Sequence, residues 1–256
     1  MPPALKRIGI GIGDEAEKVI GSAVACGARA NITCYCRPET AGTFVSSPSA
    51  NVAFALHDQP EEALVSDLMS GAIDAAVRGT LPANATLQAL KKSCGVDHLE
   101  RIALLETAGK KKFLLAPVGV DEGWTVQEKL ALIKKGRHIA KRFGISEEVG
   151  ILSGGRFGDI GRHPQVDASM ADAELVARLS GARHFEILIE DAVERCGIII
   201  APDGISGNLI FRTLIFLGGG HGHGAPVLNI DKIFVDTSRA SPDYTNALKL
   251  AASLLD

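Results

Sequence analysis

The sequence predicts an α/β protein with largely parallel sheets. Short apolar segments of strand length alternate with longer helical segments along all 256 residues, which is typical of strands joined by helices. Residues 197–201 are fully apolar, as in a strand buried on both faces. Hydrophobic residues make up 46% of the chain and charged residues 22%, which are ordinary values for a folded globular protein. The length allows one large domain or two modest ones.

The first part of the chain predicts a βαβ unit followed by further strands and helices. Isoleucine alternates with glycine over residues 7–12, and a loop rich in Pro, Ser, Thr and Gly is expected at 37–50. The expected strands are 7–12, 31–36, 52–56 and 73–77, and the expected helices are 14–25, 61–70 and 84–92.

A second part begins after Cys94-Gly95. Its clearest element is a helix over 125–143, where apolar residues recur at helical spacing behind Thr125 as the cap. The last helix is expected to start at Ser241-Pro242. The expected strands are 102–105, 113–116, 149–152, 185–189 and 197–201, with one more ending at 235, and the other expected helices are 171–179 and 209–217.

Charge, apolar runs and cysteines exclude several classes of protein. Lys and Arg number 27 against 30 for Asp and Glu, so the chain lacks the basic excess that binds nucleic acid. No signal-peptide pattern and no run of about 18 apolar residues is present, so we expect no membrane association. Five cysteines in a chain of this size favour reduced thiols in a cytoplasmic protein. Cys34 and Cys36 are read as small buried residues, and no metal site is expected.

Residues 202–208, Pro-Asp-Gly-Ile-Ser-Gly-Asn, lie between the buried strand and a helical run. Glycines in such a place let backbone N–H groups turn toward an anion at a helix N-terminus, where the helix dipole favours negative charge. The alternative is an ordinary strand-to-helix turn in which Ser206 or Asn208 caps the helix. Both readings stay open on composition alone.

Residues 235–243, at the end of another strand, contain a second group of candidate functional residues. Arg239 can bind phosphate or carboxylate through a charge-assisted fork, and Ser238 can hydrogen-bond to the same group. Asp243 is either a base or an acid that stabilises the helix dipole.

Two glycine-rich segments also have alternative readings. Residues 11–16 fit a loose G-x-G-x-x-A nucleotide or S-adenosylmethionine pattern, but alternating glycines equally permit close helix packing. Residues 218–224 contain His221 and His223, which could approach a metal. Since no third ligand is evident, we expect a mobile loop beside the cleft instead.

Several segments resemble, in chain order, the phosphate acetyl/butyryltransferases and the phosphate acyltransferase of phospholipid synthesis. Residues 196–208 are similar to the strand and PD-x-x-x-GN loop of that superfamily, and Thr237-Ser238-Arg239 with the following acid looks like its Ser-Arg-and-Asp motif. Residues 71–79 resemble its G-x-x-DA segment, and Gly13-Asp14-Glu15 its early acidic turn. In its short length and in residues 224–239, the chain looks most like the methyltransferase-related subunit X proteins of methanogens, which are also called methanogenesis marker proteins.

The resemblance implies a two-lobed fold like that of isocitrate and isopropylmalate dehydrogenases, with parallel or mixed sheets and a cleft between lobes. The lobes are expected at 1–100 plus 240–256 and at 101–239. The resemblance also implies a homodimer. The chain departs from the motif in one respect, because Asp243 follows Arg239 more closely than in phosphotransacetylases.

The resemblance implies a transferase that moves an acyl group between phosphate and a thiol such as coenzyme A, with no tightly bound cofactor. Arg239 would hold the phosphate, Asp243 would help to deprotonate the thiol, and Ser238 would assist. The phosphate-binding residues are expected to be Arg78, Asp203, Gly204, Ser206, Gly207 and Asn208. The alternative is a subunit of a methyl-transfer complex, with methyltransferase subunits as partners, that binds a phosphorylated ligand without acyl transfer.

We further expect Arg239 and the 203–208 segment to face one phosphate-sized site, on the expectation that both follow strands of the same parallel sheet.

Overall fold

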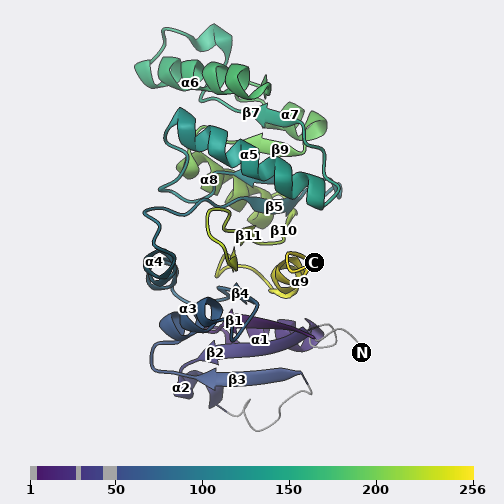
Figure 1. The fold of residues 1–256 in the computed structure, drawn as a ribbon. Helices are drawn as coiled ribbons and strands as arrows, with labels where there is room; N and C mark the ends of the chain where they lie inside the picture. The colour runs from purple at the N-terminus through teal and green to yellow at the C-terminus, as the bar shows by residue number, and fades with distance from the viewer. Residues whose placement is uncertain (1–4, 27–29, 43–50) are drawn as a thin grey trace. The chain divides into compact units, whose positions relative to one another are not determined.

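The computed structural model describes residues 5–26, 30–42 and 51–256 and divides the chain into two compact units. Unit 1 comprises Met1–Leu99 and His223–Asp256, and unit 2 comprises Glu100–Gly222. Each unit carries its own six-stranded sheet with helices packed on it (Figure 1). The chain therefore has the α/β architecture that the sequence predicts.

The sheet of unit 1 has the strand order β11-β12-β4-β1-β2-β3. All neighbouring pairs are parallel except β11 with β12. The strands are β1 (Lys6–Gly11), β2 (Ala30–Cys36), β3 (Val52–Leu56), β4 (Ala75–Val77), β11 (Ala225–Pro226) and β12 (Ile233–Asp236).

Helices cover both faces of this sheet. Helix α1 packs with α9, and α3 packs with α4. Leu64, Leu68, Ile73 and Phe234 belong to a core cluster with at most 4% of each residue exposed. The helices are α1 (Ala16–Cys26), α2 (Pro38–Ala41), α3 (Pro60–Ser70), α4 (Ala83–Cys94) and α9 (Thr245–Ser253).

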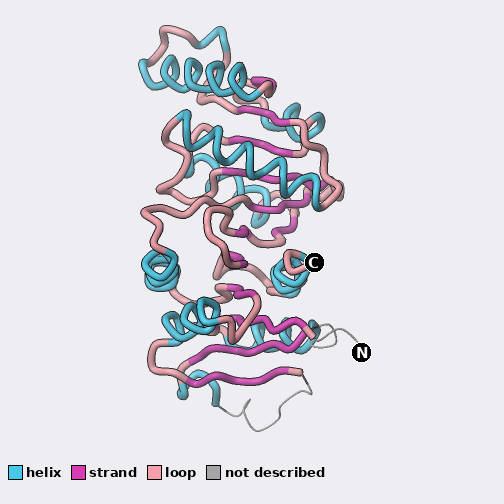
Figure 2. The backbone as a smooth tube through the Cα atoms, in the orientation of Figure 1, coloured by secondary structure: helices cyan, strands magenta, loops and turns pink. Residues whose placement is uncertain are grey.

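The sheet of unit 2 has the order β10-β5-β6-β9-β7-β8. Its strands are among those drawn in magenta in Figure 2. Its four strands β6, β9, β7 and β8 are parallel, and β5 and β10 form an antiparallel margin. The strands are β5 (Ala103–Glu106), β6 (Lys112–Ala116), β7 (Val149–Ile151), β8 (Arg183–His184), β9 (Ile198–Ile200) and β10 (His221–Gly222).

Helices α5 and α6 pack together over this sheet. Helix α5 begins where the sequence predicts, because Thr125 and Glu128 form a capping box. The helices are α5 (Val126–Arg142), α6 (Pro164–Ser180), α7 (Ile189–Arg195) and α8 (Gly204–Phe216), with a 3₁₀ turn η2 (Phe157–Asp159).

The structure corrects four sequence-based expectations. Residues 223–239 belong to unit 1 and not to the second lobe, because β12 pairs with β4. The expected strand at 185–189 is wrong, since β8 ends at His184 and α7 starts at Ile189. The stretch 218–224 is not simply a loop, because His221–Gly222 pairs with β5. A short helix, α2, occupies part of the expected loop at 37–50, of which 43–50 lie outside the described residues.

Candidate functional site

The carboxyl ends of β1, β4 and β12 meet at one edge of the unit 1 sheet, and the segment after β12 carries Ser238 and Arg239. Ligands of open parallel sheets collect at this edge. The Thr237 hydroxyl donates to the Gly79 carbonyl oxygen at 2.9 Å, which ties the segment to the end of β4. The Ser241 N–H donates to the Ser238 carbonyl oxygen at 3.1 Å and closes a turn.

Arg78 lies buried beneath this segment and holds it from inside. Its Nε donates to Asp236 Oδ1 at 2.5 Å, and its other donors reach the carbonyl oxygens of Leu81, at 2.7 Å, and Thr237. The side chains of Arg78 and Asp236 are 6% and 12% exposed. Arg78 was expected to bind phosphate, but the interactions seen here bind it to the protein. A direct contact of Arg78 with phosphate stays a prediction.

Lys18 of α1 and Tyr244, the residue before α9, also hold this segment. Lys18 Nζ donates to the Arg239 carbonyl oxygen at 2.8 Å. The Tyr244 hydroxyl donates toward the carbonyl oxygens of Ser238 and Arg239, at 3.1 and 3.3 Å. Burial raises the pKa of Tyr244 to about 12, so the phenol keeps its proton for these bonds even near pH 10, where a free tyrosine ionises. The backbone around Arg239 is thus fixed at several points.

The Arg239 side chain is exposed, and its guanidinium has no hydrogen-bond or ion-pair partner among the described residues. A rigid backbone therefore presents an uncompensated cation at the carboxyl edge of a parallel sheet. Ser238 is half-buried, and its Oγ accepts from the Ala240 N–H at 3.2 Å. These two residues lie together, as the sequence predicts.

Asp243 is exposed, and its Oδ1 accepts from the Thr245 N–H at 2.9 Å. The carboxylate therefore satisfies a free N–H in the first turn of α9, which is the structural role that the sequence left open. Helix α9 begins at Thr245, later than the expected start at Ser241. Action of Asp243 as a base stays a prediction.

The glycines at the end of β1 pack closely against the segment after β4. A Cβ at Gly11 would lie 2.1 Å from Leu81 Cδ1, and one at Gly13 would lie 2.7 Å from the Thr80 carbonyl oxygen. The Thr80 N–H donates to the Gly11 carbonyl oxygen at 3.1 Å, and the Gly13 N–H donates to the Thr80 hydroxyl at 2.9 Å. This geometry favours the packing interpretation of residues 11–16 over a dinucleotide or methyl-donor loop.

In unit 2, the expected phosphate loop is largely the first turn of α8, which starts five residues before the expected 209. Asp203 caps the helix, because its Oδ1 accepts from the Ser206 N–H at 2.7 Å. The N–H groups of Gly204 and Gly207 donate to the carbonyl oxygens of Glu122 and Asp203, each at 3.0 Å. Asn208 Nδ2 donates to the Val118 carbonyl oxygen at 3.0 Å. The bonds of Gly204 and Asn208 join α8 to the segment 117–122, and those to Asp203 cap the helix itself.

The expectation that 203–208 and Arg239 follow strands of the same sheet is wrong. Strand β9, before Asp203, pairs with β6 and β7 in unit 2, whereas β12, before Arg239, pairs with β4 in unit 1. A shared phosphate site is therefore not a consequence of sheet topology.

The sequence missed Lys129 of α5, which is buried among apolar residues. Its Nζ lies 3.8 Å from Asp172 Oδ2, and burial lowers its pKa, while the charges of Asp172 and Asp203 oppose that shift. Of the apolar residues whose spacing predicts α5, Ile133 and Ala140 are buried, whereas Val126 and Leu130 are half-buried. Lysine is normally assigned to the solvent face, so the spacing alone gives no signal for this residue.

Metal ligands do not gather in the part of the chain that the structure describes: no three His, Cys, Asp or Glu side chains there could hold an ion together. Cys34 and Cys36 are buried and free, and burial raises the pKa of both thiols, to about 12 for Cys34. Over residues 5–26, 30–42 and 51–256, no helix has both the length and the apolar character needed to cross a membrane.

Comparison with solved structures identifies the fold class of the chain. The chain superposes on a branched-chain phosphotransacylase from Enterococcus faecalis with a TM-score of 0.74 at 16% identity, covering 98% of this chain and 100% of that one. A 4-hydroxythreonine-4-phosphate dehydrogenase from Klebsiella pneumoniae gives a TM-score of 0.61 at 11% identity, covering 97% and 99%. The chain is thus an α/β protein with the fold of phosphotransacylases and related dehydrogenases.

Sequence comparison gives the family. The chain is 51% identical over 202 residues to a Methanosarcina barkeri protein named "Putative methyltransferase mtx subunit X", covering 77% of this chain and 74% of that protein. A Methanosarcina acetivorans protein of the same name is 51% identical over 200 residues, covering 76% and 71%. No family model matches the sequence. The chain belongs to the methyltransferase mtx subunit X family.

Proposed function

We propose that this protein is a transferase of the phosphotransacylase type, which moves an acyl group between phosphate and a thiol such as coenzyme A. The observation that carries the proposal is Arg239, an exposed guanidinium without a partner among the described residues, on a fixed segment at the carboxyl edge of a parallel sheet. Such a group suits an oxyanion that needs a charge-assisted fork. The likeness to phosphotransacylases shows the fold and is consistent with this chemistry.

In the proposed reaction, the thiol attacks the acyl carbon of an acyl phosphate, a carbon–sulfur bond forms and the bond to the phosphate oxygen breaks. Arg239 stabilises the charge that grows on the departing phosphate. The hydroxyl of Ser238, the residue before Arg239, hydrogen-bonds to the same phosphate. Asp243 takes the thiol proton, for which its carboxylate must release the Thr245 N–H.

The start of α8, in unit 2, is a separate candidate for anion binding. The Asp203 carboxylate already occupies the Ser206 N–H and places a negative charge where the phosphate would bind. Anion binding there requires Asp203 to move away from that N–H. Asp203→Asn removes the charge and keeps a capping oxygen, so the proposal expects it to tighten phosphate binding.

Calorimetry with inorganic phosphate tests the proposal. Arg239→Ala should weaken phosphate binding by at least 10-fold, because a charge-assisted bond contributes about 1.5–3 kcal/mol. Lys249→Ala is the matched control, since it removes one exposed positive charge from α9 of the same unit. Equal affinities of wild type and Arg239→Ala would overturn the assignment of Arg239.

The second candidate is a subunit of a methyl-transfer complex. The names of the relatives favour it, and they leave open whether the subunit itself carries out chemistry. This candidate also uses Arg239 to bind a phosphorylated ligand. Phosphate binding without any thioester formation from acyl phosphate and coenzyme A would favour it over acyl transfer.

A further inference from the structure

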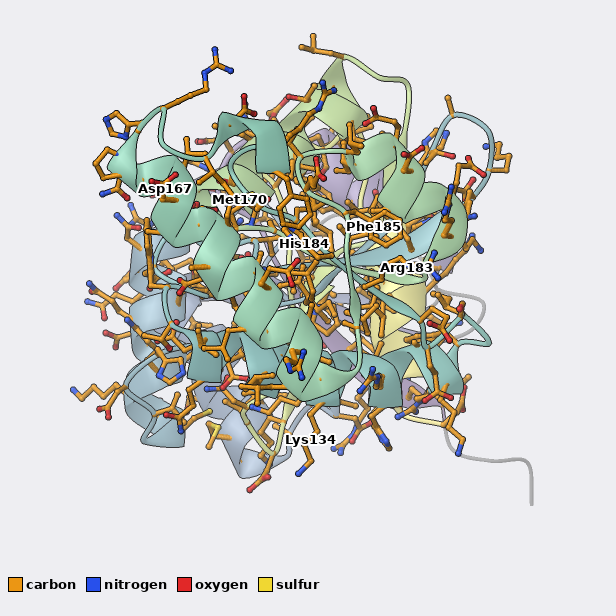
Figure 3. All side chains as sticks on the ribbon, turned by 90° about the horizontal axis from the view of Figure 1, so that it is seen from above. Lys134, Asp167, Met170, Arg183, His184 and Phe185 are labelled. Atoms are coloured by element: carbon orange, nitrogen blue, oxygen red, sulfur yellow. The ribbon has the colours of Figure 1, made fainter. Side chains whose placement is uncertain are left out.

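Three side chains of unit 2 are linked in a row by hydrogen bonds. Ser153 Oγ lies 2.9 Å from His184 Nε2, and His184 Nδ1 lies 2.7 Å from Glu174 Oε1. They come from three elements: the segment after β7, the end of β8 and the middle of α6. Figure 3 shows His184 beside α6, where Met170 is labelled.

The partners fix the state of the imidazole. A carboxylate only accepts hydrogen bonds, so Nδ1 carries the proton that it donates to Glu174. In the neutral ring, Nε2 is then a bare acceptor aimed at the Ser153 hydroxyl. This is the order of nucleophile, base and orienting acid that activates serine in many hydrolases and acyltransferases.

We propose that Ser153, His184 and Glu174 form a reactive serine site, distinct from Arg239, that accepts an acyl group from an activated ester. Ser153 Oγ attacks the carbonyl carbon, its proton passes to His184 Nε2, and Nε2 gives that proton to the leaving-group oxygen as the bond to the leaving group breaks. Water then attacks the acyl-serine, and the neutral Nε2 takes a proton from it. Nε2 returns this proton to Ser153 Oγ as that oxygen leaves the carbon, and the free acid is released. Glu174 is the positioning residue.

The three groups differ in burial. Ser153 is 1% exposed and the His184 side chain 4%, whereas the Glu174 side chain is 53% exposed. A dry hydroxyl–imidazole pair interacts more strongly than one in water. Ser153 also follows β7 at the carboxyl edge of the parallel strands, where ligands of such sheets bind.

The glycine-rich segment 154–161 lies against the Ser153–His184 pair through Phe157. Phe157 of η2 meets the His184 ring edge-on, at 5.5 Å between centroids, and is 51% exposed. Met170 Sδ lies 2.9 Å from Ser153 Oγ, and the Gly155 carbonyl oxygen lies 3.0 Å away. The hydroxyl has one proton for these acceptors, of which imidazole is the strongest base. A substrate reaches Ser153 when Phe157 moves aside.

The test is labelling of the full-length protein with a fluorophosphonate, followed by intact mass and peptide mapping. Wild type should gain one adduct, on Ser153, and Ser153→Ala none. His184→Gln should slow labelling by on the order of 100-fold, the scale of a lost general base. Phe157→Ala should speed labelling several-fold. Ser146→Ala, an exposed hydroxyl of the same unit, should label like wild type.

Glu174 is tested by variants that keep the fold, since its side chain is half-exposed. Glu174→Gln should slow labelling at an unchanged melting temperature, and Glu174→Asp should restore part of the rate. The proposal is overturned if folded wild type and Phe157→Ala both stay unlabelled, if the adduct forms on another residue, or if His184→Gln labels at the wild-type rate. The test uses neither phosphate nor coenzyme A, so its failure is separate from failure of the acyl transferase proposal.

Discussion

Replacing Arg78 with Ala should destabilise unit 1 far more than loss of a surface arginine. The change removes the buried partner of Asp236 and the donors to the carbonyl oxygens of Leu81 and Thr237. Asp236 stays buried, and the Thr237 N–H still donates to its Oδ1 at 2.8 Å. Removing one member of a buried ion pair costs about 3–5 kcal/mol, because the other charge stays uncompensated.

Arg7 provides the matched control. Its Nη2 lies 2.5 Å from Asp74 Oδ1, the same separation as in the Arg78–Asp236 pair, but its side chain is 50% exposed. Solvent screens this pair, so Arg7→Ala should cost much less. The two variants differ in burial while residue type, unit and contact distance are matched.

Thermal unfolding measures the difference. For a unit of this size, the loss at Arg78 should lower the melting temperature by roughly 10–20 °C. The double variant Arg78→Ala/Asp236→Ala should cost less than the sum of its single changes, because it leaves no buried charge. The reasoning is refuted if Arg78→Ala melts like Arg7→Ala and loses only phosphate affinity, since Arg78 would then be a ligand and not a support.

Three further predictions concern packing, titration and assembly. Gly204→Ala should destabilise unit 2 by about 1–3 kcal/mol or more in denaturant unfolding, because the new Cβ would lie 1.6 Å from the Gly119 carbonyl oxygen; Gly158→Ala, with open space around its Cβ, should be near neutral. Tyr35 and Tyr244 are the chain's two tyrosines, and burial raises the pKa of both. Little tyrosinate absorbance should therefore appear near pH 10 in the folded protein. The stability that the two protonated tyrosines contribute is fully present below pH 10 and is lost as the pH rises through about 12. Tyr244→Phe should reduce that loss. Light scattering at micromolar concentration should give the mass of a homodimer, and a monomer mass would contradict that expectation.

The fold class could be predicted because local signals agreed with one another. Helix α5 carries its own start, with Thr125 and Glu128 as a capping box, and β3 was predicted to the residue. The start of α8 was missed because Gly204 and Gly207 are typical of a loop. Their tertiary role explains them: a Cβ at Gly207 would lie 1.9 Å from the Pro117 carbonyl oxygen.

The residues of the candidate site could be predicted from the sequence, but the residues that hold them in place could not. The order Thr237-Ser238-Arg239 after a strand placed a cation at a sheet edge. The supports Lys18 and Tyr244 come from α1 and from the residue before α9, and no local pattern pairs them with Arg239. Likewise, the pairing of β12 with β4 is non-local, which explains why the predicted lobe boundary and the predicted common sheet were wrong.

Thioester formation from an acyl phosphate and coenzyme A, measured with wild type and Arg239→Ala, tests the central claim most directly. The account predicts turnover by wild type and a rate on the order of 100-fold lower for Arg239→Ala, because one preorganised charge that stabilises the departing phosphate is lost. Lys249→Ala should keep the wild-type rate. Failure of wild type to form thioester, or equal rates for wild type and Arg239→Ala, would contradict the claim.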